Sequence, residues 1–75
     1  MKQSLEELFD ELIKHQEEKL LRIARSIIPN ATSDDILQPN DYPELENHPF
    51  FRYEEGLLKG LYTAKMAMIA KKREA

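Results

Sequence analysis

Residues 34–55 read DDILQPNDYPELENHPFFRYEE, and this stretch separates two long segments of helical periodicity. It contains three of the chain's four prolines, at positions 39, 43 and 49. Proline lacks a backbone N–H and clashes with the preceding turn of a helix, so regular helices rarely run through it. The stretch therefore decides the expected fold class: all-α, a helical hairpin in which a folded connector joins two long helices.

The connector, expected at about residues 29–48, carries helix signals of its own. The Thr-Ser pair at 32–33 is suited to cap a short helical turn, and Pro43 is suited to open another. A structureless loop of about 20 residues is uncommon in a compact domain. We therefore predict short helical turns within the connector. The second long helix should begin at Pro49, with its cap at residue 47 or 48.

The first long helix is expected at about residues 5–28. Ser4 and Glu7 have the spacing of a capping box, in which each side chain accepts a hydrogen bond from the other residue's backbone N–H. Pro29 ends the helical segment. The apolar residues in between recur every three or four positions and predict one broad apolar stripe. They are Leu5, Leu8, Phe9, Leu12, Ile13, Leu20, Ile23, Ala24, Ile27 and Ile28.

The second long helix is expected at about residues 49–72, followed by a frayed basic tail at 73–75. Its apolar residues have the same helical spacing, which is typical of a helix that packs against a neighbour. The main stripe consists of Phe50, Tyr53, Leu57, Leu61, Ala64 and Met68.

The charge distribution along the chain predicts that the two helices are antiparallel. Residues 1–18 carry six acidic and two basic side chains, and residues 56–75 carry five basic side chains and one acidic. Residues 19–28 carry three basic side chains, while residues 29–55 carry seven acidic and one basic. An antiparallel hairpin pairs opposite charges at both ends, whereas a parallel pair would oppose like charges. We expect Arg22 and Arg25 to approach Glu54 and Glu55.

The chain is small, and its 75 residues are expected to form one domain, residues 1–75, without cysteine. Small proteins usually need disulfides, metals or partners for stability. Disulfides are excluded, so we predict a homodimer in which two hairpins form a four-helix bundle. The residues expected at helix–helix or dimer contacts are Leu12, Gln16, Leu20, Gly56, Gly60 and Ala64.

Two of these features have alternative interpretations. Gln16 interrupts the apolar stripe, where it either fixes the register of the bundle or reaches solvent at the edge of the stripe. Gly56, Gly60 and Ala64 form a row of small residues that either allows a tight helix crossing or marks a hinge. We favour the tight crossing.

The connector has three candidate roles. It either covers one end of the core as a lid, or binds a protein partner, or forms a small-molecule pocket. The lid is the favoured interpretation. The residues expected at a partner site are Tyr42, Phe50, Phe51 and Arg52.

The sequence gives little support for a catalytic or metal-binding function. Glu11, His15 and Glu18 share one helix face but lack the Glu-x-x-His spacing of a di-iron site, so a solvated surface explains them. We expect no catalytic residues, metal or cofactor; the alternative is a small-ligand or metal-dependent enzyme that uses His15 or His48. The net charge of −3 argues against nucleic-acid binding. No membrane segment or secretory signal is recognisable, and a cytoplasmic interaction or scaffold protein is expected.

Overall fold

The computed structural model describes residues 3–74; of Asn40, only the backbone is described. This part of the chain is all-α and contains no strand. Its elements are α1 (Leu5–Ile27), α2 (Ser33–Leu37), the 3-10 turn η1 (Pro39–Asp41), α3 (Pro43–Glu46) and α4 (Pro49–Glu74). The predicted fold class and the helical turns within the connector are therefore confirmed.

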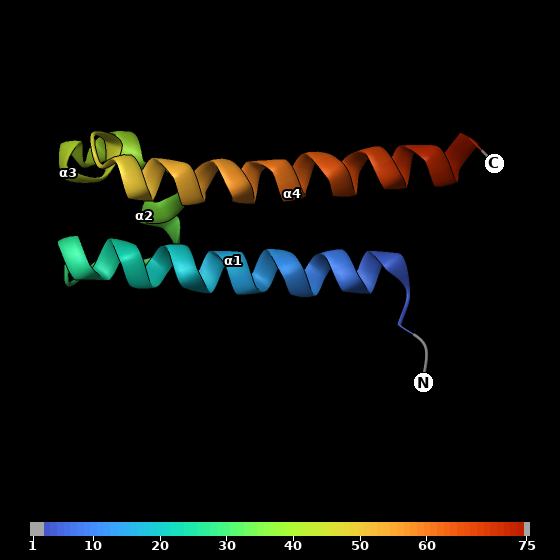
Figure 1. Ribbon diagram of the computed structural model, residues 1–75, viewed down its shortest axis with the longest axis horizontal. Helices are drawn as coiled ribbons and strands as arrows, with labels where there is room; N and C mark the ends of the chain where they lie inside the picture. The colour runs from blue at the N-terminus through green and yellow to red at the C-terminus, as the bar shows by residue number, and fades with distance from the viewer. Residues whose placement is uncertain (1–2, 75) are drawn as a thin grey trace.

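The long helices α1 and α4 lie side by side and antiparallel, as Figure 1 shows. The described part of the chain measures 44 × 26 × 18 Å. At the end opposite the connector, α4 extends beyond the first turn of α1 (Figure 1). We call this the terminal end of the hairpin.

The sequence signals set the boundaries of α1. The Glu7 N–H donates to Ser4 Oγ at 3.1 Å, and the Ser4 N–H donates to Glu7 Oε1 at 3.2 Å, which is the predicted capping box. The helix ends at Ile27, one residue before the predicted end, and the Ile28 N–H still donates to the Ala24 carbonyl.

Local caps also define the connector helices and the start of α4. The Thr32 N–H donates to Asp35 Oδ2 at 2.8 Å at the start of α2. Before α4, His48 Nδ1 accepts a hydrogen bond from the Phe51 N–H at 3.3 Å, so His48 is the cap that precedes Pro49. The helix then continues to Glu74, two residues beyond the predicted end. The predicted frayed tail is thus helical at 73 and 74, and residue 75 lies outside the described residues.

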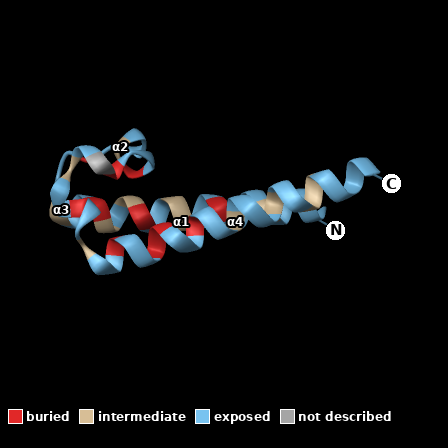
Figure 2. Ribbon diagram, turned by 90° about the horizontal axis from the view of Figure 1, so that it is seen from above, coloured by how far each residue is buried: buried red, intermediate tan, exposed pale blue. Residues whose placement is uncertain are grey.

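The core joins the connector to the half of the hairpin next to it. Phe51, Leu20 and Leu45 are the largest fully buried side chains, and they come from α4, α1 and α3. Figure 2 shows that the buried residues gather toward the connector and that α2 lies along one side of the α1–α4 pair. The full set of buried apolar residues is Ile13, Leu20, Ala24, Ala31, Ile36, Leu45, Phe51 and Leu58. The connector therefore packs along one side of the hairpin, instead of only closing its end.

Candidate functional site

Polar contacts between α1 and α4 define two sides of the hairpin. On one side, Gln16 Nε2 donates to both the carbonyl oxygen and Oε1 of Glu54, at 2.9 Å each. Lys19 Nζ lies 3.2 Å from the same Glu54 Oε1. On the other side, the Tyr62 hydroxyl donates to Glu17 Oε2.

Glu54 is a charged group inside the helix–helix contact. Only 3% of the residue is exposed. The hydrogen bond from Gln16 holds the pKa of the Glu54 carboxyl below its ordinary value; burial opposes this shift, and Lys19 adds to it. Because Gln16 binds backbone and side chain at a single position of α4, it fixes the register of the hairpin. Gln16 is itself only partly buried, so it makes these contacts at the edge of the apolar stripe.

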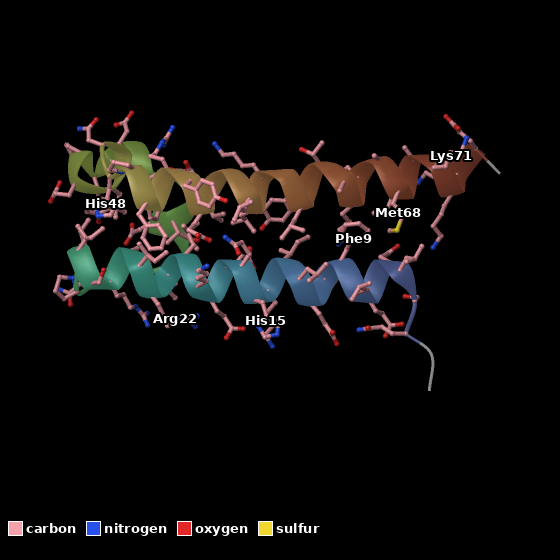
Figure 3. The ribbon with its side chains drawn as sticks, viewed as in Figure 1. Phe9, His15, Arg22, His48, Met68 and Lys71 are labelled. Atoms are coloured by element: carbon pink, nitrogen blue, oxygen red, sulfur yellow. The ribbon has the colours of Figure 1, made fainter. Side chains whose placement is uncertain are left out.

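The predicted partners of Glu54 and Glu55 need correction. Lys19, one turn before Arg22, pairs with Glu54. Arg22 points away from α4 (Figure 3), and Arg25 Nε donates to the Ala31 carbonyl at 3.0 Å. The register set by Gln16 places Glu54 beside residues 16–19, too early along α1 for the arginines.

Glu55 is neutralised within its own helix. It is buried, and its carboxylate oxygens lie 3.0 Å from Arg52 Nη1 and 3.9 Å from Lys59 Nζ. At the terminal end, Lys65 pairs with Asp10, and this hydrogen bond raises the pKa of Lys65. The predicted pairing of the acidic start of the first helix with the basic end of the second is therefore confirmed.

The first half of the apolar stripe predicted for α4 does not pack against α1, whereas Leu61 and Met68 in its second half are half-buried. The row facing α1 contains Phe51 and Leu58, with Glu54 between them. In contrast, Phe50 is 51% exposed and Tyr53 is 65% exposed. The two rows are one residue apart in the sequence, which places them about 100° apart around the helix. Thus the first half of α4 carries two apolar rows, and the chain itself covers only one of them.

The uncovered row of α4 continues across α1. Leu12, Leu8 and Leu5 are exposed and stand seven, eleven and fourteen residues before Lys19, so they lie on the Lys19 side of α1. Leu57 stands seven residues after Phe50 and, like it, lies beyond Glu54 on that same side. We define the open face by six residues: Leu5, Leu8, Leu12, Phe50, Tyr53 and Leu57. They are six of the nine large hydrophobic side chains that are exposed within residues 3–74.

The opposite side of the hairpin carries the connector. A pocket of about 170 Å³ lies between α1 and α2, with Leu21, Ile36 and Leu37 among its lining residues. Leu21 stands four residues after Glu17, on the Tyr62 side of the hairpin. The connector thus shields this side near α2 and leaves the open face uncovered.

The predicted partner-binding residues of the connector do not form one exposed site. Phe51 has no exposed surface, so its predicted role in partner contact is wrong; it fills the core instead. Tyr42 packs partly buried against that core. Arg52 is exposed and bound to Glu55, and Phe50 belongs to the open face.

The predicted packing residues also separate into two groups. Leu20 is fully buried within the hairpin, whereas Leu12 is exposed on the open face. Gly56 and Gly60 are exposed, and a Cβ added at either position would meet no atom within 4 Å. Nothing in the described chain approaches the glycine row, so the hairpin itself makes no tight crossing there, and a crossing with a helix of another molecule stays a prediction.

The histidines lie in different surroundings. His15 is exposed on the side of α1 away from α4, while His48 lies beside the connector (Figure 3). Its Nδ1 accepts the capping hydrogen bond of α4. Within residues 3–74, no three His, Asp or Glu side chains are grouped to hold a metal ion.

No known protein family, curated protein or solved structure matches this chain. In the described part of the chain, neither long helix has a segment apolar enough to cross a lipid bilayer.

Proposed function

We propose that this chain is a helical protein-interaction module that self-associates through the open face, so that two hairpins form a four-helix bundle. The observation that carries the proposal is the set of six exposed apolar side chains of the open face, three from each long helix. Exposed apolar surface gathered on one side of a protein is typical of interaction sites.

The size of the open face suits a stable interface. The 23 residues of α1 span about 35 Å, and two helices side by side are about 20 Å wide. The whole side of the hairpin that carries the open face therefore measures about 700 Å² per copy, close to the roughly 800 Å² that each partner contributes to a standard protein–protein interface. Full burial of a leucine side chain contributes about 1.5–3 kcal/mol, and three of the four leucines here are already more than half covered.

A second copy of the chain is the simplest occupant. The open face is nearly free of negative charge at its centre, because the acidic side chains of α1 lie on its other sides and Glu54 is buried. Two identical apolar faces can therefore meet without burying an unpaired carboxylate. The proposal keeps the non-catalytic role and cytoplasmic location expected from the sequence; fluorescence microscopy of a tagged chain tests the location.

Sedimentation equilibrium tests self-association. The wild-type chain should sediment as a dimer at micromolar concentration. Leu12→Glu and Leu57→Glu should each sediment as a monomer, because a carboxylate would be buried without a partner. Met66→Glu is the matched control: Met66 is 62% exposed but lies on the Tyr62 side, so this variant should remain a dimer.

Circular dichroism separates loss of association from loss of folding. All three variants should keep the helical signal of the wild type. A wild-type chain that stays monomeric up to about millimolar concentration, weaker than most specific interfaces, would contradict the proposal. Equal weakening by Leu57→Glu and Met66→Glu would show that the open face is not the contact.

A further inference from the structure

The pocket between α1 and α2 lies in a groove that one face of each helix builds. On α1 its lining residues run from Lys14 to Leu21 at spacings that keep them on one face of the helix. On α2 the lining residues Ser33, Ile36 and Leu37 also share one face. The groove is on the side of the hairpin along which α2 lies (Figure 2), opposite the open face. A ligand there would leave the open face free.

Contacts on both sides of the groove hold α2 in place. Ile36 is buried and joins α2 to the core, and Ala31, just before α2, is buried as well. Arg25 Nε of α1 donates to the Ala31 carbonyl. At the start of α2 the Thr32 N–H donates to the Asp35 carboxylate. The pocket is therefore formed before any ligand binds, and a preformed site costs less conformational entropy on binding.

The size of the pocket suits one apolar side chain. Its volume is about 170 Å³, and an apolar cavity of about 150 Å³ can hold a benzene molecule. Sites for drug-sized ligands are larger, about 300–1,000 Å³. Leu21 is half-buried and Leu37 is exposed, so apolar surface of both helices remains uncovered at the pocket. A single leucine, methionine or phenylalanine side chain of a partner would fill it.

The α1 wall of the pocket is acidic at its middle. Glu17 and Glu18 stand at the centre of the lining segment, with Lys14 one turn before them. Within residues 3–74 neither carboxylate forms an ion pair, although Glu17 accepts a hydrogen bond from the Tyr62 hydroxyl. A carboxylate can accept several hydrogen bonds, so both have acceptor sites to spare. A basic residue next to the apolar side chain would find a partner here.

We propose that this pocket is a second interaction site, which takes one bulky apolar side chain from a peptide segment of another protein and pairs an adjacent lysine or arginine of that segment with Glu17 or Glu18. The site is separate from the open face, so each hairpin of a dimer presents its own pocket.

NMR titration of the isotope-labelled chain with three capped tripeptides tests the proposal. Lys-Leu-Lys should shift the amide signals of residues 14–21 and 33–37. Lys-Ala-Lys should bind about tenfold more weakly or worse, because the apolar contact is lost. Glu-Leu-Glu should bind about two- to fivefold more weakly for each exposed pair reversed, and added salt should reduce this difference.

Variants separate the apolar contact from the charge. Leu37→Asn should abolish the advantage of Lys-Leu-Lys over Lys-Ala-Lys, while Leu37 is exposed enough for circular dichroism to show an intact fold. Glu18→Lys should reduce the preference for Lys-Leu-Lys over Glu-Leu-Glu and leave the preference for leucine over alanine unchanged. Leu57→Glu, on the open face, is the matched control and should bind Lys-Leu-Lys as the wild type does.

Equal binding of Lys-Leu-Lys and Lys-Ala-Lys, or no shift of the pocket signals up to about 10 mM peptide, overturns the proposal. Equal binding of Lys-Leu-Lys and Glu-Leu-Glu overturns the basic neighbour. Isobutylammonium that binds as tightly as Lys-Leu-Lys would assign the pocket to a small ligand instead, and pocket signals that move with protein concentration alone would assign it to a second copy. A wild-type chain that stays monomeric but binds Lys-Leu-Lys contradicts only the proposed self-association.

Discussion

The neighbouring residues Phe50 and Phe51 have opposite roles, and alanine at each position should reveal this. Phe51 has no exposed surface and fills the core. Truncating a buried phenylalanine costs about 3–5 kcal/mol. A 75-residue domain has a total stability of about 4–11 kcal/mol, at 0.05–0.15 kcal/mol per residue. Phe51→Ala should therefore remove most of the stability of the hairpin.

Phe50→Ala should affect association instead. Phe50 is 51% exposed, so its truncation should lower the stability of the monomer by about 1 kcal/mol, roughly half the value for a fully buried side chain. In the dimer its exposed half becomes buried, and the dissociation constant should rise about fivefold or more.

Urea unfolding at two protein concentrations separates the two effects. At the lower protein concentration, where the chain is monomeric, only Phe51→Ala should strongly shift the midpoint of urea unfolding. At the higher protein concentration, Phe50→Ala should lose part of the stabilisation that association adds. Phe51→Leu is a milder variant that keeps the chain folded if alanine does not. Equal shifts for Phe50→Ala and Phe51→Ala at the lower concentration would refute the division of α4 into two rows.

Three further predictions concern the contacts between the helices and the glycine row. In Gln16→Leu the pKa of the Glu54 carboxyl should rise, as followed by NMR titration, because its main hydrogen-bond donor is lost. The lowered pKa of Glu54 stabilises the fold above the ordinary carboxyl pKa of about 4.3, and this contribution should be lost as the pH falls through the lowered pKa. The loss of stability in acid should be smaller in Gln16→Leu. The hydrogen bond to Glu17, with burial, raises the pKa of Tyr62 to about 12. Spectrophotometric titration should therefore show one tyrosine that titrates late, and Tyr62→Phe should remove this signal. The stability that depends on protonated Tyr62 should be lost between about pH 10 and 12. Gly60→Ala should stabilise the monomer by about 1 kcal/mol, as thermal unfolding would show, because its Cβ meets no neighbouring element.

Local signals in the sequence were sufficient to predict the elements and their direction. Ser4, Glu7 and Pro29 define the limits of α1 through capping and the missing N–H of proline, and Pro49 defines the start of α4. Charges summed over segments were sufficient for the antiparallel direction. These are short-range or additive effects, so they can be predicted without knowing which side chains meet.

The contacts across the hairpin could not be predicted in the same way. Periodicity shows that α4 has an apolar row from Phe50 to Met68, but not whether that row faces α1 or another molecule. The row that faces α1 contains the charged residue Glu54, so a search for apolar periodicity does not find this row. Its burial depends on the pairing with Gln16 and Lys19, a long-range contact. The interruption of the stripe at Gln16 was the one signal that a polar partner lay opposite.

The core is distributed unevenly along the hairpin, and this predicts a gradient in local unfolding. On α1 the first buried residue is Ile13, and on α4 the last is Leu58, so the terminal end of both helices has no fully buried side chain. Regions with few buried apolar contacts open with small free energies, and their backbone amides exchange hydrogen quickly. Exchange should therefore be fastest in the first two turns of α1 and the last turns of α4. Leu5 and Leu8 of the open face lie in the first two turns of α1, so self-association should slow exchange there.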